Sequence, residues 1–117
     1  MTEAAQRPWP LELRLDASKR TLSVSFDTGE RFALPAEYLR VESPSAEVQG
    51  HGPGQKQVVA GKENVAIAAL EPVGNYAVRI RFDDGHDTGL YSWDYLLELG
   101  RGQKAKWEAY LRARAGA

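Results

Sequence analysis

Short stretches of the chain alternate between hydrophobic and polar residues. In PLELRLD the leucines from Leu11 to Leu15 alternate with charged residues, and TLSVSF repeats this period between Leu22 and Phe26. A period of two is typical of a strand that buries one face. The residues between the two stretches, DASKR, favour a turn. The pattern therefore predicts an antiparallel hairpin with the leucines on its buried face.

A turn, a strand and a short helix follow the hairpin. In DTGE the turn falls at Gly29, because glycine takes a positive φ without strain, and RFAL is the short strand after it. Pro35 suits the first turn of a helix, so AEYLRVE is predicted to be a helix with Tyr38 and Leu39 facing inward. Residues 43–62 show no period and many glycines and prolines, which predicts a long loop.

The second half of the chain repeats this order. After NVAIAALEPVG, which alternates again, YAVRIRF is the clearest strand, DDGHD is a turn and TGLYS is a short strand. Ser92 can cap the helix WDYLLELG, which Gly100 ends. Residues 102–115 predict a C-terminal amphipathic helix, because Trp107 and Tyr110 share one side of it.

The two halves also agree residue by residue. SVSFDTGERFALPAEYLR matches RIRFDDGHDTGLYSWDYLLE when one residue is inserted after the second strand. The matched pairs are Phe26 and Phe82, Asp27 and Asp83, Gly29 and Gly85, Leu34 and Leu90, Tyr38 and Tyr95, and Leu39 and Leu96. We therefore expect an α+β fold, a small two-layer domain. Its antiparallel β-sheet is built from two ββα-like halves, with helices on one face and a C-terminal helix.

Composition limits the classes of protein to which the chain can belong. Its 117 residues suit a single domain over residues 1–117, with residues 1–9 as a flexible N-terminal segment. The net charge of -1 disfavours binding to nucleic acid or to a membrane surface. The absence of cysteine excludes disulfides and thiolate metal sites. With neither a signal peptide nor a long apolar run, we expect a cytoplasmic protein.

Two long segments, LRVESPSAEVQGHGPGQ and PVGNYAVRIRFDDGHDTGLYSWDYLLELG, carry a family resemblance. Over most of its length the chain resembles the small stand-alone members of the gamma-butyrobetaine hydroxylase-like N-terminal domain family. In the carnitine-pathway hydroxylases this domain precedes an oxygenase domain and holds a structural zinc with three cysteines and one histidine. The resemblance places those cysteines at Ser43, Ser45 and Val48 and the histidine at His86. Serine and valine cannot replace thiolates around zinc, so the family's site is not preserved as such.

A different metal site stays open from the sequence. His51 lies in the glycine-rich loop, and His86 lies in the second turn beside Asp84. If the loop packs against that turn, the two imidazoles with a carboxylate such as Asp84 or Glu47 would suit iron or zinc. The resemblance adds a link to iron–sulfur metabolism, because the family includes versions fused to P-loop iron–sulfur carriers. The other reading is that each histidine only bonds to backbone in its turn.

Aromatic residues gathered in LYSWDYL indicate a protein contact. Tryptophan, tyrosine and arginine dominate interface hot spots. The candidate partner-binding residues are Trp93, Tyr91, Asp94 and Arg40. Arg79 and Arg81 extend the cationic rim of this surface. The other reading is that most of these aromatic side chains fill the core.

No catalytic set is evident in the sequence. GHGPG lacks the lysine and hydroxyl residue that end a phosphate-binding loop, and no nucleophile elbow surrounds a serine. A chain of this length has no room for the strands that hold an oxygenase triad. We therefore expect a small non-enzymatic accessory domain that binds an unidentified protein partner. An iron- or zinc-binding accessory protein is the alternative, and whether the chain forms a homodimer stays open.

Overall fold

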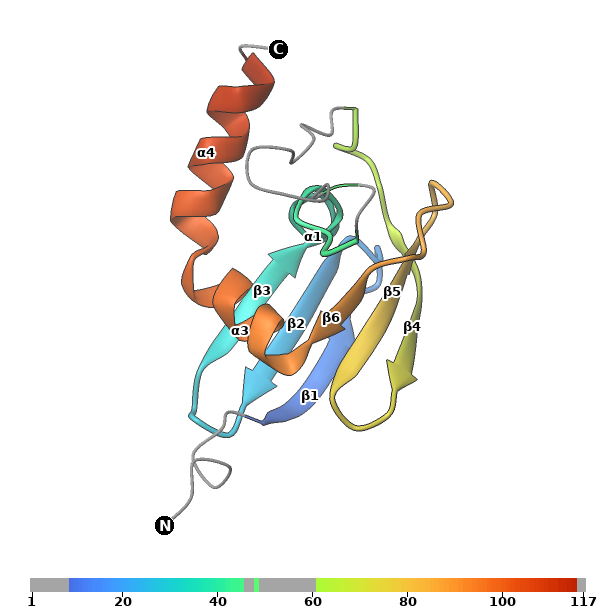
Figure 1. Cartoon of the computed structure of the whole chain (residues 1–117), viewed down its shortest axis with the longest axis vertical. Coiled ribbons are helices and arrows are strands. Elements are labelled where there is room, and N and C mark those ends of the chain that lie inside the picture. Colours follow the sequence, from blue (N-terminus) through green and yellow to red (C-terminus); the bar gives the residue numbers. More distant parts are fainter. Residues whose placement is uncertain (1–8, 46–47, 49–60, 116–117) are drawn as a thin grey trace.

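The computed structural model describes residues 9–45, 48 and 61–115. In chain order the elements are β1 (Pro10–Leu15), β2 (Thr21–Phe26), β3 (Arg31–Pro35), α1 (Ala36–Val41), β4 (Ile67–Val73), β5 (Ala77–Phe82), β6 (Leu90–Ser92), α3 (Trp93–Arg101) and α4 (Gln103–Ala115). In Figure 1 the chain runs through β1, β2, β3 and α1, then through β4, β5, β6 and α3, and ends with α4. The α+β class and the C-terminal helix are as predicted. Most of the predicted loop lies outside the described residues.

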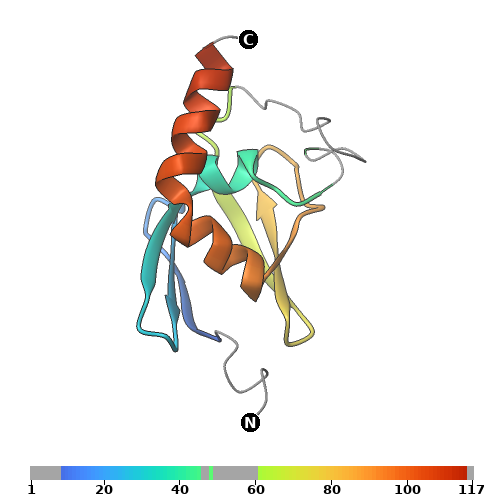
Figure 2. The same cartoon turned by 60° about the vertical axis from the view of Figure 1, so that its left-hand side comes forward.

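The strands form two antiparallel sheets, where the sequence predicted a single one. One sheet has the order β1-β2-β3, and the other has the order β4-β5-β6. In Figure 2 the sheets lie on opposite sides of the molecule, with α3 between them. The backbone N–H of Ile67 donates to the carbonyl of Lys19 at 2.8 Å, which bonds the second sheet to the first hairpin. One hydrophobic core includes side chains from both sheets.

The same turn follows β2 and β5. In each turn the N–H of the phenylalanine donates to the carbonyl four residues later at 2.9 Å, in Phe26–Glu30 and in Phe82–His86. The glycines three residues after each phenylalanine, Gly29 and Gly85, have φ of 91° and 93°. Only glycine takes such a φ without strain. The matched halves of the sequence are therefore two copies of one ββα architecture.

The inserted residue lies earlier than the sequence comparison placed it. Leu34 pairs with Leu22 in the first sheet, and Tyr91 pairs with Val78 at the corresponding position of the second sheet. Leu34 therefore corresponds to Tyr91, which is also buried, and not to Leu90, which is 39% exposed. The extra residue of the second half belongs to the connection that leads into β6.

The first strand of each sheet contains a β-bulge. The pairing register shifts at Leu11 in β1 and at Ala68 in β4. An extra residue in one strand of a pair is left out of the ladder and bends the strand. Leu11 is 67% exposed as a result, so the prediction that it shares a buried face with Leu13 and Leu15 is wrong.

Two tyrosines bond α1 and α3 to each other. The hydroxyl of Tyr38 in α1 donates to the carbonyl of Leu99 at 2.7 Å, and the hydroxyl of Tyr95 in α3 donates to the carbonyl of Glu42 at 2.6 Å. Carbonyls at a helix C-terminus have no donor within their own helix. Each tyrosine therefore satisfies the end of the opposite helix. Burial raises the pKa of both tyrosines above the ordinary value, so both stay protonated donors.

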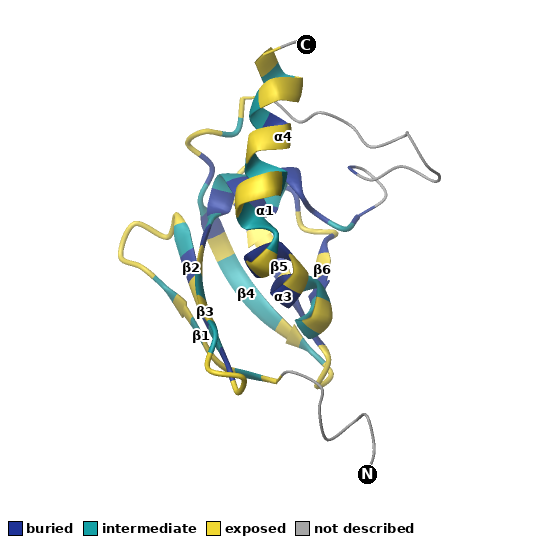
Figure 3. Ribbon diagram, turned by 90° about the vertical axis from the view of Figure 1, so that its left-hand side faces the viewer, coloured by how far each residue is buried: buried dark blue, intermediate teal, exposed yellow. Residues whose placement is uncertain are grey.

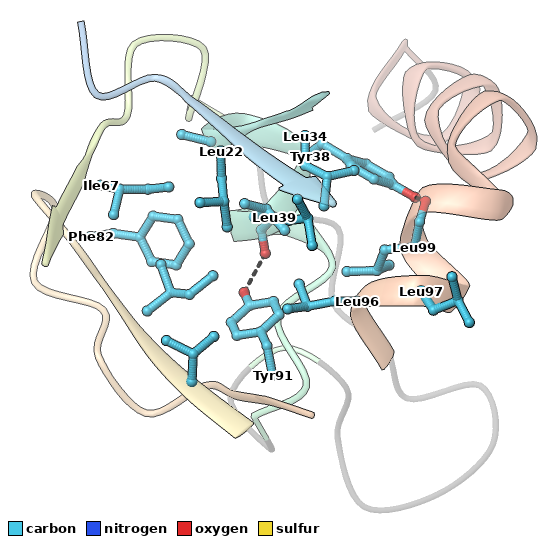
Figure 4. Close-up of a cluster of buried hydrophobic side chains, with 14 of the residues drawn as sticks. Leu22, Leu34, Tyr38, Leu39, Ile67, Phe82, Tyr91, Leu96, Leu97 and Leu99 are labelled. Atoms are coloured by element: carbon cyan, nitrogen blue, oxygen red, sulfur yellow. Dashed lines mark hydrogen bonds between the residues drawn. The ribbon is translucent and has the colours of Figure 1, made fainter. Parts of the chain in front are cut away.

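The core lies between the two sheets and beneath α1 and α3. Figure 4 shows Ile67 and Phe82 of the second sheet near Leu22 of the first, with Leu39 and Leu96 from the two helices. The hydroxyl of Tyr91 reaches through this core and donates to the carbonyl of Leu39. These side chains carry the hydrophobic free energy that holds the two halves together.

Helix α4 packs on the molecule with one side only. Trp107 lies edge-on to Tyr38 with ring centroids 6.2 Å apart, and Tyr110 is buried beside it. Figure 3 shows the outward side of α4 as exposed. Arg114 continues the inner side and pairs with Glu37 at 3.0 Å. None of the helices in the described ranges is long and apolar enough to cross a bilayer.

Replacing either interhelical tyrosine by phenylalanine is expected to destabilise the protein. Tyr38→Phe and Tyr95→Phe each leave a helix-end carbonyl without its donor, which lowers the free energy of unfolding by about 1–2 kcal/mol. Urea denaturation followed by circular dichroism measures the change. Tyr76→Phe is the matched control, because that side chain is 55% exposed. Losses no larger than that of the control would contradict the structural role of the two bonds.

Candidate functional site

The turn after β5 buries a histidine against the end of α1. His86 is 7% exposed, and its Nε2 lies 2.9 Å from Oγ of Ser43 and 3.4 Å from Oγ of Ser45. The hydroxyl of Ser43 also donates to that of Ser45 at 3.4 Å. These contacts, which we call the His86 latch, fasten the chain after α1 to the second turn.

The latch depends on a glycine in the connection to β6. A Cβ at Gly89 would lie 2.6 Å from Oγ of Ser43 and 3.1 Å from the ring of Tyr91. Real Cβ atoms essentially never come as close as the first distance and seldom as close as the second, and both neighbours are fully buried. Glycine at this position is what lets β6 pass next to Ser43.

The histidine and serine of the latch do not form a dyad that a substrate can reach. Their separation of 2.9 Å is that of a base and a nucleophile. However, Ser43 is 0% exposed. A fully buried hydroxyl is not open to a reacting carbonyl in this arrangement.

Asp84 forms a second contact between the same turn and the rest of the chain. Its Oδ2 lies 2.9 Å from Nε of Arg40 and 2.6 Å from Nζ of Lys62, and its Oδ1 accepts the backbone N–H of His86 at 3.0 Å. Burial by itself raises the pKa of Asp84. The hydrogen bonds from Lys62, the His86 backbone and Arg40 outweigh it and lower the pKa to about 2. The carboxylate is therefore charged at neutral pH.

Arg40 and Asp84 are placed differently from the sequence prediction. Arg40 was a candidate for a surface contact, but its side chain is 12% exposed and bonded to Asp84. Its Nη1 is buried with no hydrogen-bond acceptor among the described residues. Asp84 was a candidate metal ligand, but both of its oxygens accept bonds from protein donors. Two cations already occupy the position in which a metal ion would neutralise it.

The predicted metal set is only partly described by the structure. His86 directs Nε2 at Ser43, while His51 and Glu47 lie outside the described residues. Within the described ranges, no group of three or more His, Cys, Asp or Glu side chains is placed to hold a metal ion. The idea that the start of the loop meets the second turn is nevertheless correct, because Ser43 and Ser45 contact His86.

The first repeat has an ion pair at the position of His86. Glu30 ends the first turn as His86 ends the second, and its carboxylate accepts two hydrogen bonds from Arg101 at 2.7 and 2.8 Å. These bonds from Arg101 lower the pKa of Glu30 to about 2. Both repeats thus connect the turn to the end of the opposite helix, one by charge and the other by an imidazole.

A glycine packs beside each of the two connections, but it stands on opposite sides of the contact in the two repeats. A Cβ at Gly100 would lie 2.5 Å from the ring of Phe32. In the second repeat the glycine is Gly89, in the connection just before β6, and the side chain opposite it is Ser43. The first repeat thus has a large residue facing a glycine, whereas the second has a glycine facing a serine. That exchange provides the space for the His86 latch.

The aromatic candidates divide between core and surface. Tyr91 is 0% exposed and bonds to Leu39, so it belongs to the core and does not lie on a contact surface. Trp93 is partly buried, and its Nε1 donates to the carbonyl of Asn75 at 2.9 Å. Asp94 follows it in the first turn of α3 and is exposed.

Two more residues border Trp93, of which the sequence indicated Trp9 as either a packing anchor or an interface residue and did not indicate Tyr76. Trp9 is 47% exposed and lies edge-on to Trp93 with ring centroids 6.4 Å apart, and Tyr76 is 55% exposed. The carbonyl of Tyr76 accepts the N–H of Trp93 at 3.2 Å. We call Trp9, Tyr76, Trp93 and Asp94 the aromatic patch. Tyr76 directly follows the turn VGN in the sequence, and this position indicated that it could be exposed. Its proximity to Trp93 depends on the tertiary structure.

The fold and the site define a class: a small α+β domain made of two ββα repeats, whose polar centre among the described residues is the buried His86 latch. The chain belongs to the family described as Gamma-butyrobetaine hydroxylase-like, N-terminal, which it matches over residues 13–97. The resemblance seen in the sequence is therefore confirmed. No curated protein matches the chain.

Three solved structures are similar to this chain. One is a solution NMR structure with 52% identity and a TM-score of 0.79, covering 99% of this chain and 87% of that one. A second solution NMR structure has 45% identity and a TM-score of 0.79, covering 92% and 84%. The third is a crystal structure of a DUF971 family protein of unknown function from Acidithiobacillus ferrooxidans, with 41% identity, a TM-score of 0.65 and coverage of 78% and 91%.

Neutralising Asp84 is expected to change how stability depends on pH. A carboxylate whose pKa is lowered to about 2 on folding contributes stability above its ordinary pKa of 3.8, and this contribution is lost as the pH falls from there to about 2. Asp84→Asn should therefore destabilise the protein near pH 7 and show a much smaller difference from the wild type near pH 2.

Thermal unfolding of both proteins across this pH range measures the effect. Asp87→Asn, which changes an exposed carboxylate in the same turn, is the control. A difference between wild type and Asp84→Asn that stays constant from pH 7 to pH 2 would show that the charge of Asp84 does not stabilise the turn.

Proposed function

We propose that the protein is a non-enzymatic binding domain of the cytoplasm that acts by contact with a protein partner. The aromatic patch is the observation that carries this proposal. Among the described residues the exposed large hydrophobic side chains are Trp9, Leu11, Tyr76 and Leu90. Two of these four border Trp93, and exposed apolar side chains that gather in one place are typical of interaction sites.

The geometry of the patch favours a recognition surface. Trp9 leads into β1 of the first repeat, whereas Trp93 begins α3 of the second. Their edge-to-face contact therefore joins the two halves at the surface. The bond from Nε1 of Trp93 to Asn75 fixes the indole before any partner arrives. An anchor that is already ordered costs less conformational entropy on binding.

In the part of the chain that the structure describes, the one cluster of histidine and serine is buried, which favours a binding role over catalysis. The only histidine in the described ranges is His86, and it is buried against two serines. The exposed carboxylate of Asp94 lies beside Trp93 and is available to a basic group at the rim of an interface.

Capture of a partner on the tagged protein tests the proposal. Quantitative mass spectrometry compares the wild type with Trp9→Ala, Tyr76→Ala and Trp93→Ala after circular dichroism has shown that each variant is folded. We expect at least one of the three to reduce recovery of a specific partner about tenfold or more, as an interface hot spot does. Leu11→Ala is the matched control, since Leu11 is 67% exposed and lies outside the patch. A partner recovered equally by all four variants would refute the patch.

Metal binding through His51, His86 and Asp84 stays a prediction that the contacts of Asp84 disfavour. Elemental analysis of the untagged protein is expected to show much less than one iron or zinc ion per chain. His86→Ala should leave that low value unchanged. One equivalent of metal that is lost in His86→Ala would replace the present proposal with a metal-binding function.

A further inference from the structure

The backbone of β1 is unpaired along one edge. β1 is an outer strand of its sheet, and Figure 3 shows it at the margin of the molecule. At the end of the β1–β2 ladder, the N–H of Asp16 donates to the carbonyl of Thr21 at 3.1 Å. Because bonded and non-bonded pairs alternate along an antiparallel ladder, Leu15 and Leu13 direct their N–H and C=O groups away from β2. No described residue bonds to those groups.

The other strand edges are less suited to pairing. In β3 the carbonyl of Ala33 accepts a hydrogen bond from Nε2 of Gln103 at 3.3 Å, so α4 lies against that edge. β4 has a bulge at Ala68, and it contains Pro72, which has no N–H. β6 has only three residues. Proteins protect sheet edges in these ways, and among the described strands the regular stretch of β1 over residues 12–15 lacks such protection.

The side chains of this edge are incompletely covered. Leu13 and Leu15 pack against the core but stay partly exposed. On the opposite face Glu12 and Arg14 pair with each other at 2.8 Å, with side chains 52% and 71% exposed. An exposed ion pair of this kind contributes little to stability. The edge thus has apolar groups on one face and one charge of each sign on the other.

We propose that β1 pairs with β1 of a second copy of the chain. The inference goes beyond the proposed function, because it concerns a different surface and a different partner. Two antiparallel copies related by a two-fold axis at Leu13 exchange the backbone bonds of that residue and join their three-stranded sheets. In this register Glu12 of each copy lies opposite Arg14 of the other. The partly exposed leucines of the two copies cover each other on the inner face.

The charges of β1 select this register over its neighbours. Only alternate residues have unpaired backbone groups, so the two strands can shift only in steps of two residues. A shift in one direction places Arg14 opposite Arg14, and a shift in the other direction places Glu12 opposite Glu12. Like charges directly opposite each other destabilise a sheet, whereas unlike charges stabilise it. The charge pattern of β1 therefore matches a second copy of β1 in one alignment.

Sedimentation equilibrium and amide hydrogen exchange test the pairing. A short edge buries less area than a stable dimer needs, so we expect a dimer that forms only at high protein concentration. In that range the amides of Leu13 and Leu15 should become protected, whereas those of Glu12 and Arg14 bond to β2 in monomer and dimer alike. A chain that stays monomeric up to its solubility limit would overturn the inference. A dimer that protects amides near Trp9 and Tyr76 instead would place the second copy on the aromatic patch, and would overturn it too.

Charge reversal tests the register. Glu12→Arg places arginines opposite each other in the dimer, and Arg14→Glu places glutamates opposite each other. Each variant alone should therefore associate about tenfold more weakly than the wild type. An equimolar mixture of the two variants restores both unlike pairs, so it should form a heterodimer with an affinity close to that of the wild type. Both side chains are more than half exposed, and circular dichroism verifies that each variant is folded.

Arg31→Glu is the matched control for the charge reversals. Arg31 is exposed on β3, and its replacement changes the net charge by as much as Arg14→Glu does. Its self-association should equal that of the wild type. Single variants that dimerise as tightly as the wild type, or a mixture that associates no more tightly than either variant alone, would overturn the pairing of β1 with itself.

Discussion

The structure depends on the exchange of hydrogen bonds between α1 and α3 through Tyr38 and Tyr95. A helix of six residues such as α1 does not persist in water by itself, because its few internal bonds do not offset the cost of nucleation. Each tyrosine buries its ring in or beside the core and satisfies a carbonyl at the end of the other helix. The two ββα units are therefore coupled, and neither helix is fully bonded without the other repeat.

Within this shared framework the two repeats have diverged at their polar connections. Glu30 with Arg101 forms an exposed ion pair, whereas His86 with Ser43 and Ser45 forms a buried latch. The latch has room because glycine stands at position 89, where the first repeat has Phe32, and this admits the side chain of Ser43. Positions that the resemblance assigned to zinc ligands, Ser43, Ser45 and His86, do lie together. Here hydrogen bonds between an imidazole and two hydroxyls hold the segments.

Comparison of the two repeats also distinguishes positions at which packing requires a particular residue from positions at which it does not. Residues that are equivalent and buried in both halves, such as Phe26 and Phe82, serve packing. Residues that differ on exposed faces, such as Ser23 and Arg79, are not fixed by packing. The tryptophan that begins α3 also has no counterpart in the first repeat, where α1 begins with Ala36.

The sequence by itself determined most elements, their repeated ββα order and the family, because alternation, turn glycines and cap residues are local signals read within a few positions. It did not determine that the strands split into two sheets, since both arrangements bury the same faces. It placed Leu11 in the core because a bulge has no clear sequence signal. Tertiary structure alone decided that Tyr91 is buried, that Arg40 forms an ion pair with Asp84, and that Trp9 contacts Trp93. Each of these depends on contacts between residues far apart in the chain, and no local period encodes them.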